Sequence, residues 1–148
     1  FPEDAAVSIV ARAMIDPFEF MMNLHKKDKL KTKFPNSLGK VAYHAPCHQR
    51  VQNIGPKTRE VLELIPNTEV INIERCSGHD GTYAVKKENH EFSKKICRPV
   101  VRRIEEHDVD SFVSDCPMAG DLIAAGVEQG NEKYSRTVFS LLRYAYGI

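Results

Sequence analysis

The sequence predicts an α/β fold, in which a small three-stranded parallel sheet is flanked by helices and preceded by an N-terminal helical extension. From residue 40 onward, short apolar stretches typical of strands alternate with longer amphipathic stretches typical of helices. Such alternation favours parallel strands joined by right-handed crossovers. A chain of 148 residues is long enough to bury one core. We therefore divide it into a helical extension and linker over residues 1–39 and a cysteine-rich α/β domain over residues 40–148.

The N-terminal segment is predicted to be helical over residues 4–27, where apolar side chains recur on one face. A break is expected at Asp16-Pro17, because proline cannot continue a helix interior, and a second short helix restarts there. The basic, polar stretch over residues 26–39 predicts a linker. Because the chain lacks an initiator methionine and a signal-peptide pattern, we expect a fragment or processed piece of a longer protein.

The main unit is predicted to alternate strands and helices. The strands cover residues 41–43, 69–73 and 111–113, and the helices cover residues 56–65, 85–107, 118–129 and 134–146. An apolar residue at every fourth position of the long helix predicts its buried stripe. These residues are Phe92, Ile96, Val100 and Ile104. Cys97 lies beside this stripe, so we expect it to pack in the core rather than to bind a metal.

The other cysteines, Cys47, Cys76 and Cys116, each come shortly after a predicted strand. The carboxyl ends of parallel strands lie at one edge of a sheet, and open α/β sheets bind ligands in the loops at that edge. The topology therefore predicts that the three thiols lie near one another.

Three histidines flank these cysteines, in the segments His44-Ala-Pro-Cys47-His48 and Cys76-Ser-Gly-His79. Zinc and iron favour thiolate and imidazole ligands, and this short spacing allows both side chains to reach one ion. The candidate ligands of a metal or cluster are Cys47, Cys76, Cys116, His79, His44 and His48. Which histidine completes the site stays open, since each could instead hydrogen-bond a loop carbonyl. The alternative role for the cysteines is that of small buried apolar side chains.

Composition excludes several functions. Lys and Arg number 21 against 20 Asp and Glu, so the charge balance does not predict a nucleic-acid partner. No apolar run reaches 18 residues, so no transmembrane segment is predicted. Four cysteines are too few for a disulfide scaffold, which favours the reducing cytoplasm. The sequence carries no nucleotide-binding or serine-hydrolase motif. Cys47 and His48 are adjacent, and adjacent residues seldom place a nucleophile and a base within hydrogen-bond distance of each other. No catalytic residue is therefore assigned.

Three short motifs follow one another within residues 40–148. They are His44-x-x-Cys47-His48, Cys76-x-Gly-x-x-Gly-Thr-Tyr and Asp115-Cys116. Together they resemble the cysteine-rich CCG domain that occurs in heterodisulfide reductase and in the iron-sulfur subunit of anaerobic glycerol-3-phosphate dehydrogenase. The resemblance implies an electron-transfer domain with an iron-sulfur cluster on its cysteines.

The resemblance also implies partners. They are a flavoprotein dehydrogenase subunit, a ferredoxin-like domain, and a quinone or disulfide that accepts the electrons. The expected location is the cytoplasm, with membrane association only through a partner.

The sequence departs from the family pattern at two positions. Ser77 stands where the second cysteine of Cys-Cys-Gly is expected, and Ala119 stands where the last cysteine of Cys-x-x-Cys is expected. Three thiolates and one histidine could still hold zinc or iron, or a cubane cluster with one non-cysteine ligand. The alternative function is a zinc-stabilised protein interaction module that has lost the redox cluster, and a third is direct thiol chemistry at an open metal position.

Overall fold

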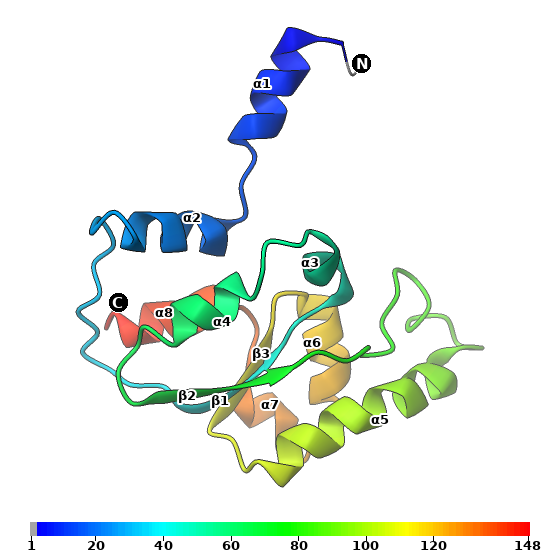
Figure 1. The fold of residues 1–148 in the computed structure, drawn as a ribbon. Coiled ribbons are helices and arrows are strands. Elements are labelled where there is room, and N and C mark those ends of the chain that lie inside the picture. The colour runs from blue at the N-terminus through cyan, green and yellow to red at the C-terminus, as the bar shows by residue number, and fades with distance from the viewer. Residues whose placement is uncertain (1–2) are drawn as a thin grey trace. The chain divides into compact units, whose positions relative to one another are not determined.

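The computed structural model describes residues 3–148, which divide into two compact units (Figure 1). The first unit ends at Lys31 and the second runs from Thr32 to Ile148. We describe each unit separately.

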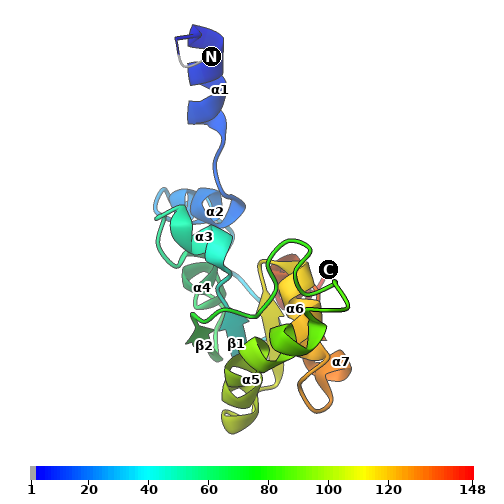
Figure 2. The ribbon, with the colours of Figure 1, turned by 90° about the vertical axis from the view of Figure 1, so that its right-hand side faces the viewer.

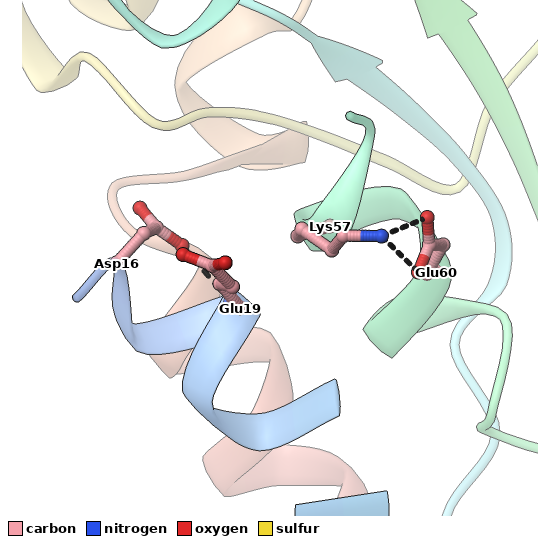
Figure 3. A network of polar contacts seen from close by, with 4 residues as sticks. All are labelled: Asp16, Glu19, Lys57 and Glu60. Carbon is pink, nitrogen blue, oxygen red and sulfur yellow. Dashed lines mark hydrogen bonds and ion pairs between the residues drawn. The ribbon is translucent and has the colours of Figure 1, made fainter. Parts of the chain in front are cut away.

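The first unit consists of helices α1 (Ala5–Ala13) and α2 (Pro17–His25). The carboxylate of Asp16 caps α2 by accepting hydrogen bonds from the backbone amides of Phe18 and Glu19, at 2.9 and 3.1 Å. Figure 3 shows Asp16 beside Glu19 in the first turn. Proline fits the first helical position because its missing N–H has no partner there. The expected break at Asp16-Pro17 is therefore confirmed.

The second unit is built on a four-stranded sheet in the order β2-β1-β3-β4, in which all neighbouring strands are parallel. The strands are β1 (Gly39–His44), β2 (Thr68–Ile73), β3 (Ser111–Ser114) and β4 (Tyr134–Ser135). The predicted fold class is confirmed, except that the sheet has a fourth strand. That strand pairs with β3 and places the ring of Tyr134 on that of Phe112, with 5.1 Å between the ring centroids.

Six helices accompany the sheet. They are α3 (Cys47–Val51), α4 (Lys57–Leu62), α5 (His90–Glu106), α6 (Pro117–Ala124), α7 (Gly130–Lys133) and α8 (Val138–Ala145). Figure 1 shows α4 and α8 on one face of the sheet and α5 on the other. On the second face, α5 packs beside α6 over a core that includes Ile71, Phe112 and Ile123 (Figure 2). The sheet is thus covered on both faces, as parallel sheets generally are.

The first turn of α4 carries a surface ion pair. Lys57 Nζ lies 2.7 and 2.9 Å from the two carboxylate oxygens of Glu60 (Figure 3). Pairs of this kind at i,i+3 on a helix stabilise it by only about 0.2–0.5 kcal/mol. Burial of Val61 and Leu62 therefore contributes more to holding α4 on the sheet.

The predicted buried stripe of α5 is wrong in its first half. Phe92 and Ile96 are 57% and 42% exposed, whereas the buried residues of the helix are Ser93, Cys97, Val100 and Ile104. A strict four-residue spacing drifts around a helix with 3.6 residues per turn, while the observed spacing of four, three and four follows one face. Cys97, which is 3% exposed, packs in the core as predicted.

The last predicted helix, over residues 134–146, is also corrected. Its first residues form β4, and α8 begins only after Thr137, whose side chain accepts a hydrogen bond from the amide of Ser140 at 3.2 Å. Threonine is favoured at this N-cap position, which fixes where the helix starts. None of the helices in residues 3–148 is long and apolar enough to cross a bilayer.

Two isoleucines of α5 test the observed burial. Ile104→Ala is expected to lower the free energy of unfolding by about 2–5 kcal/mol, because it removes a buried side chain and leaves a cavity. Ile96→Ala removes the same atoms from an exposed position and should cost less than about 1 kcal/mol. Urea denaturation measures both, and equal losses would contradict this assignment of the buried face.

Candidate functional site

The three cysteines predicted to form a site lie in three loops at the carboxyl edge of the sheet. Cys47 begins α3 after β1, Cys76 lies in the loop after β2, and Cys116 is the N-cap residue of α6 after β3. Cys47 and Cys76 are exposed and Cys116 is half-buried. Within residues 3–148, no group of three or more His, Cys, Asp or Glu side chains is arranged to hold a metal ion. The fold thus brings the three loops to one edge, and convergence of their thiols on one ligand stays a prediction.

The loop that carries Cys76 is held closely against α5. Gly78 has a φ of +80°, and a Cβ atom there would lie 2.4 Å from the backbone oxygen of Ser93. The hydroxyl of Ser93 donates a hydrogen bond of 2.7 Å to the carbonyl of Gly78. The amide of Gly78 in turn points toward Cys76 Sγ, with 3.4 Å between nitrogen and sulfur. Only glycine combines this positive φ with so close an approach of the loop to the helix.

Cys47 lies beside a positive charge, whereas Cys97 is enclosed in the core. Arg50 Nη2 lies 3.2 Å from Cys47 Sγ, so a cation is placed beside a sulfur that would carry negative charge as a ligand. Burial, and secondarily the nearby Cys76, raises the pKa of Cys97 to about 11. Cys97 therefore stays a neutral core thiol, while Cys76 faces solvent.

His44 is buried, with 2% of its surface exposed, and both of its ring nitrogens are engaged. Nδ1 lies 2.9 Å from the hydroxyl of Ser114, and Nε2 lies 2.8 Å from the carbonyl oxygen of Arg75. Burial lowers the pKa of His44, and the charge of Arg50 acts in the same direction. In this arrangement neither ring nitrogen is free to bind a metal.

His48 and His79 are placed differently from His44. His48 is the exposed second residue of α3, and His79 lies half-buried in the loop after Cys76. Within the described part of the chain, neither imidazole makes a hydrogen bond or an ion pair. Neither imidazole is therefore engaged by another side chain or carbonyl of residues 3–148, and a neutral imidazole offers one ring nitrogen as a metal ligand.

A polar network behind the site was not predicted from the sequence. The hydroxyl of Tyr43 contacts the carboxylate of Asp115, at 2.5 Å, and the side-chain amide of Gln49. Thr58 donates to the same carboxylate oxygen at 2.8 Å and accepts from Gln49 at 2.9 Å. Burial and the Asp115 charge raise the pKa of Tyr43, so its hydroxyl remains a donor. The network joins β1, α3 and α4 to the residue that precedes the third cysteine.

The sequence contains only one weak indication of this network. A buried tyrosine next to the His-x-x-Cys motif requires a partner for its hydroxyl, yet the sequence does not say which residue supplies it. Gln49 and Thr58 lie on short helices, and the first of these, α3, was not predicted. The geometry of the folded chain is needed to connect them to Asp115.

The two family departures both lie inside the protein. Ser77 is 5% exposed and its hydroxyl is 3.4 Å from the amide of His79, whereas Ala119 is 2% exposed in α6. The remaining donors are of the chemical kind that binds iron in sulfur-ligated centres. They comprise three accessible thiols, of which one lies beside a guanidinium and one accepts a backbone N–H, the kind of hydrogen bond that tunes cluster potentials.

Comparison with known proteins agrees with the resemblance seen in the motifs. The family model described as a cysteine-rich domain, CCG, matches residues 41–118, which is more than half of the chain. The chain belongs to the CCG cysteine-rich domain family. The matched range of this CCG domain begins within β1 and ends at the start of α6, so it contains all three cysteine loops.

Two curated relatives of the CCG domain are informative. One is a subunit of the anaerobic glycerol-3-phosphate dehydrogenase of Escherichia coli (strain K12), which is 42% identical over 78 residues that cover 52% of this chain and 20% of that protein. The other is an uncharacterized iron-sulfur protein of Methanocaldococcus jannaschii, which is 36% identical over 80 residues that cover 53% of this chain and 16% of that protein. The match therefore spans a fifth or less of these relatives. No solved structure matches the chain significantly.

A substitution at Tyr43 tests the polar network. Tyr43→Phe removes the hydroxyl, which leaves the buried side-chain oxygen of Gln49 without its partner and takes one donor from the half-buried Asp115, so the free energy of unfolding should fall by about 1–3 kcal/mol. Tyr144→Phe is the matched control, since its ring is 58% exposed, and should change stability by less than about 0.5 kcal/mol. Urea denaturation compares the two variants, and equal stability of both would contradict the network.

Proposed function

We propose that this CCG domain is part of an iron-sulfur oxidoreductase and transfers electrons through a cluster held by Cys47, Cys76 and Cys116. The observation that carries the proposal is the placement of these thiols in three consecutive loops at one sheet edge. Membership of the CCG family and the naming of one relative as an iron-sulfur protein support the choice of cluster. An iron-sulfur cluster supplies reversible one-electron chemistry when it is bound.

The residues of this chain would act on such a cluster in distinct ways. The three cysteines would bind it as thiolates, Arg50 would offset negative charge at Cys47, and the amide of Gly78 would hydrogen-bond the sulfur of Cys76. His79 or His48 would supply a further ligand, because both imidazoles are accessible. The lost thiols at positions 77 and 119 make such a ligand necessary for a four-ligand site.

The proposal about partner subunits rests on one relative. The Escherichia coli relative is by name part of an anaerobic glycerol-3-phosphate dehydrogenase, which supports a role beside a dehydrogenase subunit. We propose that electrons reach this domain from a flavoprotein dehydrogenase, by way of a ferredoxin-like domain, and leave toward a quinone or a disulfide. Such an assembly would lie in the cytoplasm or be held at a membrane by a partner.

Anaerobic reconstitution with iron and sulfide tests the proposal. The protein is expected to take up iron and acid-labile sulfide, with visible absorbance and a paramagnetic signal on reduction. Cys47→Ala, Cys76→Ala and Cys116→Ala should each abolish stable uptake, because each removes a thiolate ligand. Cys97→Ala is the matched control and should retain the cluster, since this thiol is buried in the core.

Two results would overturn the proposal. One is a folded protein with neither iron nor sulfide after reconstitution. The other is stoichiometric zinc without a chromophore, which would favour an interaction module, because zinc is redox-inert. Zinc gains no support from these two relatives, neither of which is named for it.

A further inference from the structure

A chain of three hydrogen bonds crosses the carboxyl edge of the sheet through His44. The amide of Cys116 donates to the hydroxyl oxygen of Ser114 at 3.2 Å. The Ser114 hydroxyl and His44 Nδ1 are 2.9 Å apart, and His44 Nε2 and the carbonyl oxygen of Arg75 are 2.8 Å apart. We call these groups the His44 relay: the Cys116 amide, the Ser114 hydroxyl, the His44 imidazole and the Arg75 carbonyl.

We propose that the His44 relay positions the loops of Cys76 and Cys116 relative to each other, and that His44 is a positioning residue rather than a ligand. The inference deepens the proposed function, because it rests on those two cysteines being ligands. It also assigns a role to Ser114, which the motifs do not single out.

The direction of each bond in the relay follows from chemistry. A carbonyl can only accept, so Nε2 of His44 carries the hydrogen and Nδ1 is the acceptor. The hydroxyl of Ser114 must then donate to Nδ1, and its oxygen accepts the amide of Cys116. Every donor meets an acceptor, so the neutral imidazole is held in one tautomer.

Burial makes the relay costly to break. His44 is 2% exposed and Ser114 is 1% exposed, so water cannot readily replace a lost partner. A buried polar group without a partner costs about 1–3 kcal/mol. The relay should therefore remain closed in the folded protein.

The sheet order explains why His44 can reach both loops. β1 lies between β2 and β3, and His44, its last residue, is aligned with Ile73 on one side and Ser114 on the other. The chain after Ile73 leads through Arg75 to Cys76, and the chain after Ser114 leads to Cys116. Residues at the ends of β2 and β3 are separated from each other by β1, so neither strand end adjoins both loops.

An imidazole suits this place because it is rigid and carries one donor and one acceptor on opposite sides of the ring. Asparagine reproduces the position of Nδ1 and glutamine that of Nε2, so each amide can replace one half of the relay. His44→Asn should keep the bond to Ser114 and lose the bond to Arg75. His44→Gln should keep the bond to Arg75 and lose the bond to Ser114.

Amide hydrogen exchange on the protein without cluster tests the relay directly. We expect faster exchange confined to residues 74–79 in His44→Asn, and faster exchange confined to residues 114–118 in Ser114→Ala and His44→Gln. Two controls lie away from the relay. Ser111→Ala removes a buried hydroxyl at the other end of β3 that has no hydrogen-bond partner in residues 3–148, and His107→Ala removes an imidazole beyond the end of α5. Neither control should change exchange in the two loops.

Iron release from the reconstituted protein to a chelator tests the link to ligation. Loss of groups that orient metal ligands commonly weakens binding about 10–100-fold, so release from the three relay variants should be at least about tenfold faster than from wild type. The paramagnetic spectrum of the retained cluster should stay that of wild type, whereas loss of a histidine ligand would change it. Uniform or unchanged exchange in the variants, unchanged iron release, or a changed spectrum would each overturn the positioning role.

The two proposals fail separately. A wild-type protein that binds no iron or sulfide would overturn the proposed function, while hydrogen exchange would still decide whether the relay holds the two loops. Conversely, reconstituted clusters that release iron at the wild-type rate in all three relay variants would leave the proposed function standing and overturn the relay.

Discussion

The central position of β1 in a parallel sheet is the constraint on which the site depends. Because β2 and β3 flank it in the same direction, the chain leaves all three strands at one edge, and each exit carries a cysteine. Side chains of successive strand residues point to opposite faces. Tyr43 and His44, the last two residues of β1, therefore organise opposite sides of that edge: Tyr43 through Asp115, and His44 through Ser114. The last two residues of β1 thus contact Ser114, the last residue of β3, and Asp115, which follows it.

These polar groups stand where a parallel sheet would otherwise bury only apolar side chains. Their cost is offset because each finds partners, in the Tyr43 network on one face and the His44 relay on the other. Satisfied buried networks specify one arrangement of the groups that join them. The cysteine loops lie at the surface, but the strand ends from which they begin are fixed by these buried hydrogen bonds.

The strands and their cysteine loops could be predicted because they depend on local pattern and on the rules for parallel crossovers. β4 could not, since two residues carry no periodicity and Tyr134 is fixed by pairing with Phe112. The face of α5 was misjudged because Phe92 and Ile96 are apolar yet exposed, and apolar residues on a surface are common. The hydrogen bonds of His44 to Ser114 and Arg75 could not be predicted, since the spacing of His44 from Cys47 is equally compatible with a metal ligand and with a side chain that hydrogen-bonds neighbouring loops.

The chain has the CCG family fold with serine at position 77 and alanine at position 119, where the resemblance leads us to expect cysteine. Serine differs from cysteine by one side-chain atom, and both Ser77 and Ala119, which lies within α6, are small buried side chains. The three cysteines of the motifs are exposed or half-buried, and each has a hydrogen-bonding neighbour: Arg50 beside Cys47, Gly78 beside Cys76, and Ser114 beside Cys116. A change in thiolate number would then alter the kind of centre that the edge can hold without altering the edge itself.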